Sequence, residues 1–130
     1  MANYIDGFVL PIPLDRLNEY QRVAESVAEI WKEHGALDYW EYVGDDMNLE
    51  GMRSFNDLAA ATKDETIVFG WVVFDSREAR DLVNEKVAAD PRMAELVEPL
   101  TDPSNPIFDA KRMAYGGFQS LVRSPNVDAG

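Results

Sequence analysis

The stretch from Thr66 to Phe74, which reads TIVFGWVVF, decides the fold of this protein. It is rich in β-branched and aromatic residues, which favour a β-strand. One face of such a strand carries Ile67, Phe69, Trp71 and Val73, and the other carries Val68, Val72 and Phe74. An antiparallel strand with one face in water alternates apolar and polar residues, and this stretch does not. We therefore expect both of its faces to be covered.

The sequence on either side of this strand predicts an α+β chain. Further strands are expected at Tyr4–Ile12, Ala36–Val43 and Lys111–Val122, with helices at Leu14–His34 and Ser76–Ala89 and a short helix beginning at Asp90-Pro91. Ser76 and Asp90 are residue types that cap helix N-termini, and proline is favoured at the first helical position. Residues 55–61 are compatible with a short strand or a turn of helix, and the rest of residues 45–63 has no assignment.

The first helix shows the clearest periodicity. Its apolar side carries Leu17, Tyr20, Ala24, Val27, Trp31 and His34. These positions recur at spacings of three and four with charged residues between them, which is typical of an amphipathic helix. Gly35 follows directly and is the expected C-cap, because glycine readily adopts the left-handed backbone conformation that ends helices.

The order strand, helix, strand, strand, helix, strand is that of the ferredoxin-like βαββαβ fold. This fold is an antiparallel sheet with two helices on one face, so its other face is bare. The apolar stretch 66–74 requires a cover for that face, and a symmetric copy of the same sheet is the simplest one. We therefore expect a homodimer whose chain forms one domain at residues 1–123, followed by a flexible tail at residues 124–130.

Composition limits the classes of function. The 130 residues, 46% of them hydrophobic, suit a single globular domain. There are 24 acidic against 12 basic residues, and the resulting net charge of −12 repels nucleic-acid phosphates and anionic lipid surfaces. The chain has no cysteine, and no signal peptide or membrane-spanning apolar run is apparent. We expect a cytoplasmic protein without nucleic-acid or membrane partners.

Six stretches of the chain, in this order, resemble one family of bacterial proteins. They are residues 4–9, 34–37, 44–46, 64–69, 89–93 and 108–118. Together they are similar to the YbaA-like family, whose function is unknown, and the likeness covers nearly the whole chain. The resemblance implies a dimeric α/β barrel, in which two ferredoxin-like sheets pack face to face. Relatives in that wider superfamily include cofactor-independent monooxygenases, haem-degrading enzymes and stress-response proteins, so the fold alone selects no activity.

A candidate ligand site is expected between the helices and the sheet. Trp31 and His34 would enter it from the first helix, and Trp40, Trp71 and Arg112 from the sheet. Aromatic side chains line sites for planar ligands, although ordinary core packing uses them as well. His34 is the single histidine and the candidate catalytic group, as a proton acceptor. Its alternative role is a favourable position at the negative end of the helix dipole.

We expect neither a metal nor a cofactor. One histidine and no cysteine are too few for histidine- or thiolate-based zinc and iron sites. Residues 46–57 match a calcium loop only in part, because Asp57 stands where Glu is usual and a strand precedes the loop. Dinucleotide, phosphate-loop and nucleophile-elbow motifs are missing. The pair Gly116-Gly117 in the last strand predicts a bulge or a close approach of another backbone or a ligand.

Two hypotheses about function stay open. In the first, the protein is a cofactor-independent oxidoreductase or isomerase that acts on a small hydrophobic metabolite. In the second, it is a non-catalytic dimer that binds a metabolite or a protein and has a stress-related role. An enclosed cavity with a few polar groups favours the first hypothesis, and a solid core at the same place favours the second.

Overall fold

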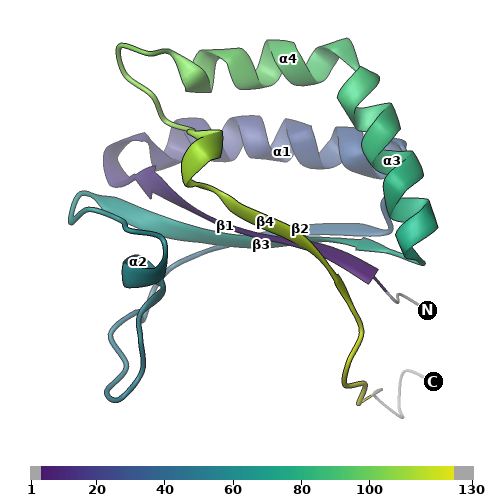
Figure 1. The fold of residues 1–130 in the computed structure, drawn as a ribbon. Helices are drawn as coiled ribbons and strands as arrows, with labels where there is room; N and C mark the ends of the chain where they lie inside the picture. Colours follow the sequence, from purple (N-terminus) through teal and green to yellow (C-terminus); the bar gives the residue numbers. More distant parts are fainter. Residues whose placement is uncertain (1–3, 125–130) are drawn as a thin grey trace.

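The computed structural model describes residues 4–124, which form a four-stranded antiparallel sheet with helices on one side (Figure 1). The elements are β1 (Tyr4–Pro13), α1 (Leu17–Glu33), β2 (Asp38–Val43), α2 (Phe55–Leu58), β3 (Glu65–Phe74), α3 (Arg77–Ala89), α4 (Pro91–Val97) and β4 (Ala114–Gln119). The strand order is β2-β3-β1-β4, and α1, α3 and α4 cover one face. This is the expected ferredoxin-like α+β fold.

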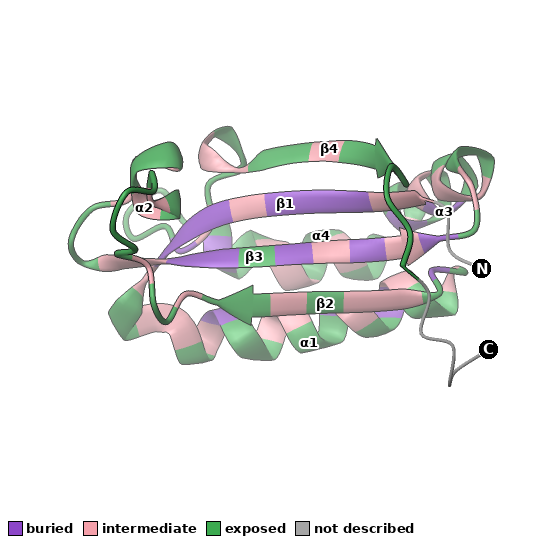
Figure 2. Ribbon diagram, turned by 90° about the horizontal axis from the view of Figure 1, so that it is seen from below, coloured by how far each residue is buried: buried purple, intermediate pink, exposed green. Residues whose placement is uncertain are grey.

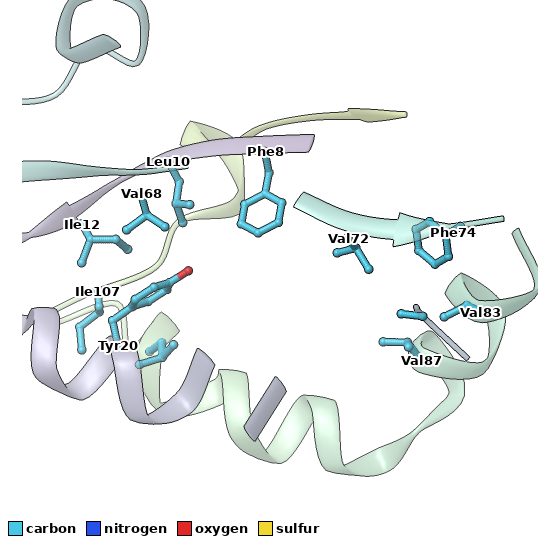
Figure 3. Packing of buried hydrophobic residues seen from close by; sticks show 12 residues of the cluster. Phe8, Leu10, Ile12, Tyr20, Val68, Val72, Phe74, Val83, Val87 and Ile107 are labelled. Atoms are coloured by element: carbon cyan, nitrogen blue, oxygen red, sulfur yellow. The ribbon is translucent and has the colours of Figure 1, made fainter. Parts of the chain in front are cut away.

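The register of the strands separates the two faces of the sheet. In the β1–β3 pair, Leu10 lies opposite Val68, and Phe8 lies opposite Gly70. These residues face the helices, where they join Val72 and the helical residues in the hydrophobic core (Figure 3). The intervening residues of β3, from Ile67 to Val73, face the other way. The predicted assignment of residues 66–74 to two apolar strand faces is therefore confirmed.

The helix ends follow the predicted caps. The N–H of Ala36 donates to the carbonyl of Trp31, and that of Gly35 donates to the carbonyl of Lys32. Gly35 has a φ of +119°, so these two bonds form a Schellman motif that requires glycine at this position. Ser76 and Asp90 accept backbone hydrogen bonds at the starts of α3 and α4, as predicted.

The first helix and the last strand differ in extent from the sequence-based expectation. The first helix begins with a 3-10 turn, Leu14–Arg16. Residues 55–58 form a turn of helix, which is one of the two expected alternatives. The last strand is shorter than the expected 111–122. The carboxylate of Asp109 accepts the N–H of Lys111 and starts a 3-10 turn at Ala110–Arg112. At its other end β4 stops at Gln119, opposite the first residue of β1. Most of the expected tail, residues 125–130, lies outside the described residues.

The face of the sheet away from α1, α3 and α4, called here the open face, carries five aromatic residues in contact with one another. We call Trp40, Tyr42, Trp71, Phe69 and Phe55 the aromatic strip. Successive ring centroids in this order lie 6.3, 5.4, 5.7 and 5.7 Å apart. Phe55 belongs to α2, which lies on the open face and covers one end of it (Figures 1 and 2). Trp71 is half-buried, while Trp40 and Tyr42 remain 44% and 56% accessible.

None of the helices within residues 4–124 is long and apolar enough to cross a bilayer.

Candidate functional site

A cavity of about 180 Å³ lies between the sheet and the helices. Its walls are Tyr20, Val23, Ala24, Val27 and Trp31 of α1, Phe8, Tyr39, Glu41, Val72 and Tyr115 of the sheet, and Met93, Val97, Leu100, Phe108 and Met113 of the segment that covers it. Figure 3 shows Phe8 and Val72 above this space and Tyr20 below it, with the hydroxyl group directed toward the sheet. The cavity therefore has the predicted place, and its lining is mainly apolar.

Glu41 is the one acidic residue of the cavity wall, and two tyrosines hold it. The hydroxyl of Tyr20 donates to Oε1 of Glu41 at 2.5 Å, and that of Tyr39 donates to Oε2 at 2.7 Å. Tyr39 and Glu41 share the helix-side face of β2, because residues two apart on a strand point the same way. Tyr20 reaches them from α1. A more open groove along the free edge of β2 shares these three residues, so the cluster lies between cavity and surface.

Burial changes the acid–base properties of this cluster. It raises the pKa of Glu41, because a charged carboxylate is poorly solvated there, and the two phenol hydrogen bonds only partly oppose that effect. Burial and the neighbouring Glu41 also raise the pKa values of Tyr20 and Tyr39. Both phenols are therefore neutral hydrogen-bond donors at physiological pH.

A second polar cluster lies at the β4 side of the cavity. Asp6 is fully buried, and its two oxygens accept from Arg80 Nη1 at 3.1 Å and from the Tyr115 hydroxyl at 2.7 Å. Arg80 also donates to the hydroxyl of Tyr4. The ring of Tyr115 stacks on Phe8 at 5.9 Å. Because a guanidinium compensates the buried charge, this cluster ties α3 to the sheet and fixes the Tyr115 ring at the cavity wall.

Of the five predicted site residues, only Trp31 lines the cavity. Its ring makes an edge contact with Phe74 at 6.3 Å. His34 was expected to face the sheet beside it. Instead its Nε2 lies 2.8 Å from Oδ2 of Asp90, at the start of α4. His34 is the C-cap of α1, and its side chain is directed to the N-terminal cap of α4.

The remaining three predicted residues lie elsewhere. Trp40 and Trp71 are paired across β2 and β3, and both belong to the aromatic strip. Their side chains point to the open face, because successive residues of a strand alternate between the two faces and their neighbours Tyr39, Glu41 and Val72 line the cavity. Arg112 lies on the 3-10 turn before β4 and not on a strand. Its guanidinium makes two hydrogen bonds to Glu65, at 2.7 and 2.8 Å, and one to the carbonyl of Ala60. The five residues therefore do not form one site within the chain.

The polar residues on the helix side of the sheet were missed by the site prediction, although the sequence holds a signal for two of them. Asp6 and Glu41 are carboxylates inside strands that are otherwise apolar and aromatic. The alternation of side chains along a strand places both on the helix side of the sheet. Burying an unpaired charge there costs free energy, so each carboxylate needs hydrogen-bonding partners. The tyrosine partners of Glu41 come from α1 and from β2 itself, and no local pattern identifies them.

No group of three or more potential metal-ligating His, Asp or Glu residues occurs within residues 4–124.

Solved structures with a similar arrangement define the class of this fold. A NIPSNAP family protein of unknown function from Agrobacterium tumefaciens matches with a TM-score of 0.59 at 16% identity, covering 95% of this chain and 92% of its own. The ActVA-Orf6 monooxygenase of Streptomyces coelicolor, solved in complex with nanaomycin D, has a TM-score of 0.57 at 17% identity, with 96% and 93% of the chains covered. At these identities the likeness concerns the fold.

The sequence comparisons place the chain within one family of this class. Residues 3–108 match the protein family of unknown function DUF1428. The uncharacterized protein YbaA of Escherichia coli strain K12 is 38% identical over 119 residues, which are 92% of this chain and 97% of YbaA. YbaA of Shigella flexneri matches equally well. The chain belongs to the DUF1428 family, and the resemblance to YbaA-like proteins is confirmed.

Proposed function

We propose that this protein is a small-molecule enzyme that binds a compact hydrophobic metabolite in the cavity between α1, α4 and the sheet. The observation that carries the proposal is an apolar cavity into which a few polar groups converge, namely Glu41 with Tyr20 and Tyr39, and Tyr115 on the opposite side. Sites for small ligands have this composition, whereas a purely structural core is filled.

The fold class supports an organic ligand. The similar ActVA-Orf6 structure is a monooxygenase in complex with nanaomycin D, so this fold is compatible with binding an organic ligand. Trp31, which was predicted as a ligand-binding residue, supplies an aromatic wall. We propose that it contacts the ligand. A cofactor-independent oxidoreductase or isomerase agrees with these features.

We further propose that the protein works as a homodimer in the cytoplasm. The aromatic strip supports the dimer, because large exposed apolar patches on soluble proteins mark interaction sites. Trp40 and Trp71 would then serve the interface between protomers. The lack of cysteine agrees with a reducing compartment.

The test of ligand binding is a screen of compact cyclic hydrophobic compounds by thermal shift and tryptophan fluorescence. A ligand should raise the melting temperature by mass action. Ala24→Phe, which fills the cavity from α1, should abolish the shift. Ala88→Phe, on the exposed side of α3, is the matched control and should leave the shift unchanged. Ligands that bind Ala24→Phe as well as the wild type would refute the proposed site.

His34→Ala tests the earlier candidate in the same screen. His34 pairs with Asp90 and does not line the cavity, so we expect a lower melting temperature without ligand but an unchanged shift on ligand binding. A ligand-induced shift lost in this variant would restore His34 as a site residue.

A further inference from the structure

Glu41 stands out among the carboxylates because it lies at the cavity wall and has only neutral partners in its hydrogen bonds. Both of its oxygens are held by phenol hydroxyl groups, at 2.5 and 2.7 Å. Asp6, the other carboxylate on this face of the sheet, is fully buried and bonded to the guanidinium of Arg80. A carboxylate compensated by a fixed cation is a poor proton acceptor, whereas one held by neutral donors retains basicity.

We infer that Glu41 transfers a proton to and from the ligand of this cavity, and that the substrate is a compact cyclic carbonyl compound with an acidic C–H bond. This inference rests on the proposed function of the same cavity. It assigns Glu41 as the catalytic residue, with Tyr20 and Tyr39 holding its carboxylate.

The surroundings of Glu41 suit general base catalysis. Burial strengthens a carboxylate as a base, and the pKa of Glu41 is raised by that cause. The position of the cluster between the cavity and the edge groove gives a substrate access from the cavity side. The rest of the wall is apolar and aromatic, which suits a hydrophobic substrate.

The reaction that fits this arrangement is a shift of a double bond. The carboxylate of Glu41 removes a proton from the carbon between the carbonyl group and a C=C bond. The electron pair of the broken C–H bond moves onto the carbonyl oxygen and forms a dienolate. Glu41 is then neutral, so the hydroxyl hydrogens of Tyr20 and Tyr39 can follow the negative charge to that oxygen. Returning the proton to the far end of the C=C bond gives the conjugated ketone, without any oxidant or cofactor.

The size of the cavity limits the substrate. Its volume is about 180 Å³. An apolar cavity of about 150 Å³ in another protein holds benzene. The cavity described here therefore takes a single six-membered ring with a small substituent, and a fused polycyclic compound would need the covering segment to move.

The experiment uses the full-length protein with two probes. Cyclohexanone measures binding, through the thermal shift. Cyclohex-3-enone measures catalysis, through the ultraviolet absorbance of the cyclohex-2-enone that it forms. We expect wild-type protein to bind cyclohexanone and to accelerate the isomerisation. Glu41→Gln should keep the fold and the binding but lower the isomerisation rate by at least about 100-fold, which is the usual contribution of a general base.

A second variant keeps the test decisive if Glu41→Gln does not fold. Glu41→Asp retains a carboxylate but withdraws it by one methylene group, and such a displacement costs about 100-fold in rate. The inference about Glu41 fails alone if cyclohexanone binds wild type and is excluded by Ala24→Phe, but wild type does not accelerate the isomerisation or the Glu41 variants do so at the wild-type rate. If cyclohexanone does not bind wild type, or binds Ala24→Phe equally well, the proposed function of the cavity fails as well.

Discussion

Single residues show how a carboxylate is accommodated in three different ways in this protein. Asp6 is buried and accepts a hydrogen bond from the guanidinium of Arg80. Glu41 is held by the hydroxyl groups of two tyrosines. Glu65 lies near the surface and accepts hydrogen bonds from the guanidinium of Arg112. The cost of removing a carboxylate from water is offset by a cation in the first and third cases. Only Glu41 is left with neutral donors, and this difference is the basis of its proposed role.

The Glu65–Arg112 pair should make stability depend on pH in the acid range. Hydrogen bonds from Arg112 lower the pKa of Glu65 from its ordinary value of 4.5 to about 2. A carboxyl group whose pKa is lower in the folded state stabilises that state above pH 4.5, and the stabilisation is lost as the pH falls toward 2. In Glu65→Gln, the free energy of unfolding measured with urea should therefore decline less steeply between pH 4.5 and 2 than in wild type.

Arg112→Gln is the matched control for that measurement. It leaves the carboxyl group of Glu65 in place but removes its cation, so the pH dependence should flatten to a similar extent. Parallel curves for wild type and both variants would mean that the pair does not contribute to the pH dependence of stability.

Gly70 illustrates a position where a single methyl group decides the packing. A Cβ atom there would collide with the ring of Phe8 and would lie 2.7 Å from the carbonyl oxygen of Trp40. Gly70→Ala should therefore lower the free energy of unfolding by about 2 kcal/mol, the usual cost of overpacking a core. Urea denaturation measures this effect.

Gly116→Ala, in the same sheet, is the control for Gly70→Ala. The nearest atom to its Cβ would be in Phe118, at 3.9 Å, which is an ordinary contact. Its effect on stability should stay within about 0.5 kcal/mol. At the Gly116-Gly117 pair the pairing with β1 is continuous, and what lies close to Gly117 is the side chain of Tyr4 and not the backbone or ligand that was predicted. A loss of stability as large in Gly116→Ala as in Gly70→Ala would contradict this explanation.

At the scale of elements, capping residues start the helices of the C-terminal half. The hydroxyl of Ser76 accepts the N–H of Ala79 at 3.1 Å, and Asp90 accepts the N–H of Arg92 at 2.9 Å. These bonds satisfy backbone donors that have no partner within the helix. The caps therefore fix where α3 and α4 begin, and α4 with the following turn provides the cover of the cavity.

Ser76→Ala should lower the free energy of unfolding by about 1 kcal/mol, because it removes the cap of α3. Ser26→Ala is the matched control, since Ser26 is exposed on α1 and alanine has the higher helix propensity. The control should be neutral or slightly stabilising in the same urea titration. Equal effects of the two substitutions would show that the Ser76 cap adds nothing to stability.

At the scale of the whole molecule, the open face is an apolar surface that a single chain leaves exposed to solvent. α2 covers one end of it, yet Phe69 remains 42% and Phe118 57% accessible. Aromatic surface exposed to water is unfavourable, and burying it against a second copy of the same face would remove it from solvent on both partners. The dimer proposal follows from this face and not from the site.

Sedimentation equilibrium should give about twice the chain mass of 14.6 kDa for wild type. Phe69→Glu places a charge in the middle of the aromatic strip and should yield monomers or unfold the protein. Leu82→Glu, at a 58% exposed position of α3 on the opposite side, should remain dimeric. A folded wild-type monomer at micromolar concentration would exclude the face-to-face dimer.

The elements and their order follow from local features of the amino-acid sequence. Periodicities of two and of 3.6 residues report which side of a strand or helix is buried, and caps and glycines mark the ends, so these features depend on neighbours within a few positions. The two-sided strand at residues 66–74, the amphipathic α1 and the helix end at Gly35 were all predicted in this way. The 3-10 turn at Arg112 was missed, although Asp109 is a residue type that caps such turns.

The site was decided by the tertiary structure alone. Tyr20 meets Glu41 from 21 positions away, and Tyr115 meets Asp6 from 109 positions away. The direction of His34 at a helix end and the face on which Trp40 and Trp71 lie depend on backbone geometry and strand register. A cavity exists where helices and a sheet fail to fill the space between them, and that is a property of all the packed surfaces together. Local periodicity carries no information about such long-range contacts, so the sequence predicted where a cavity would lie but not which side chains would line it.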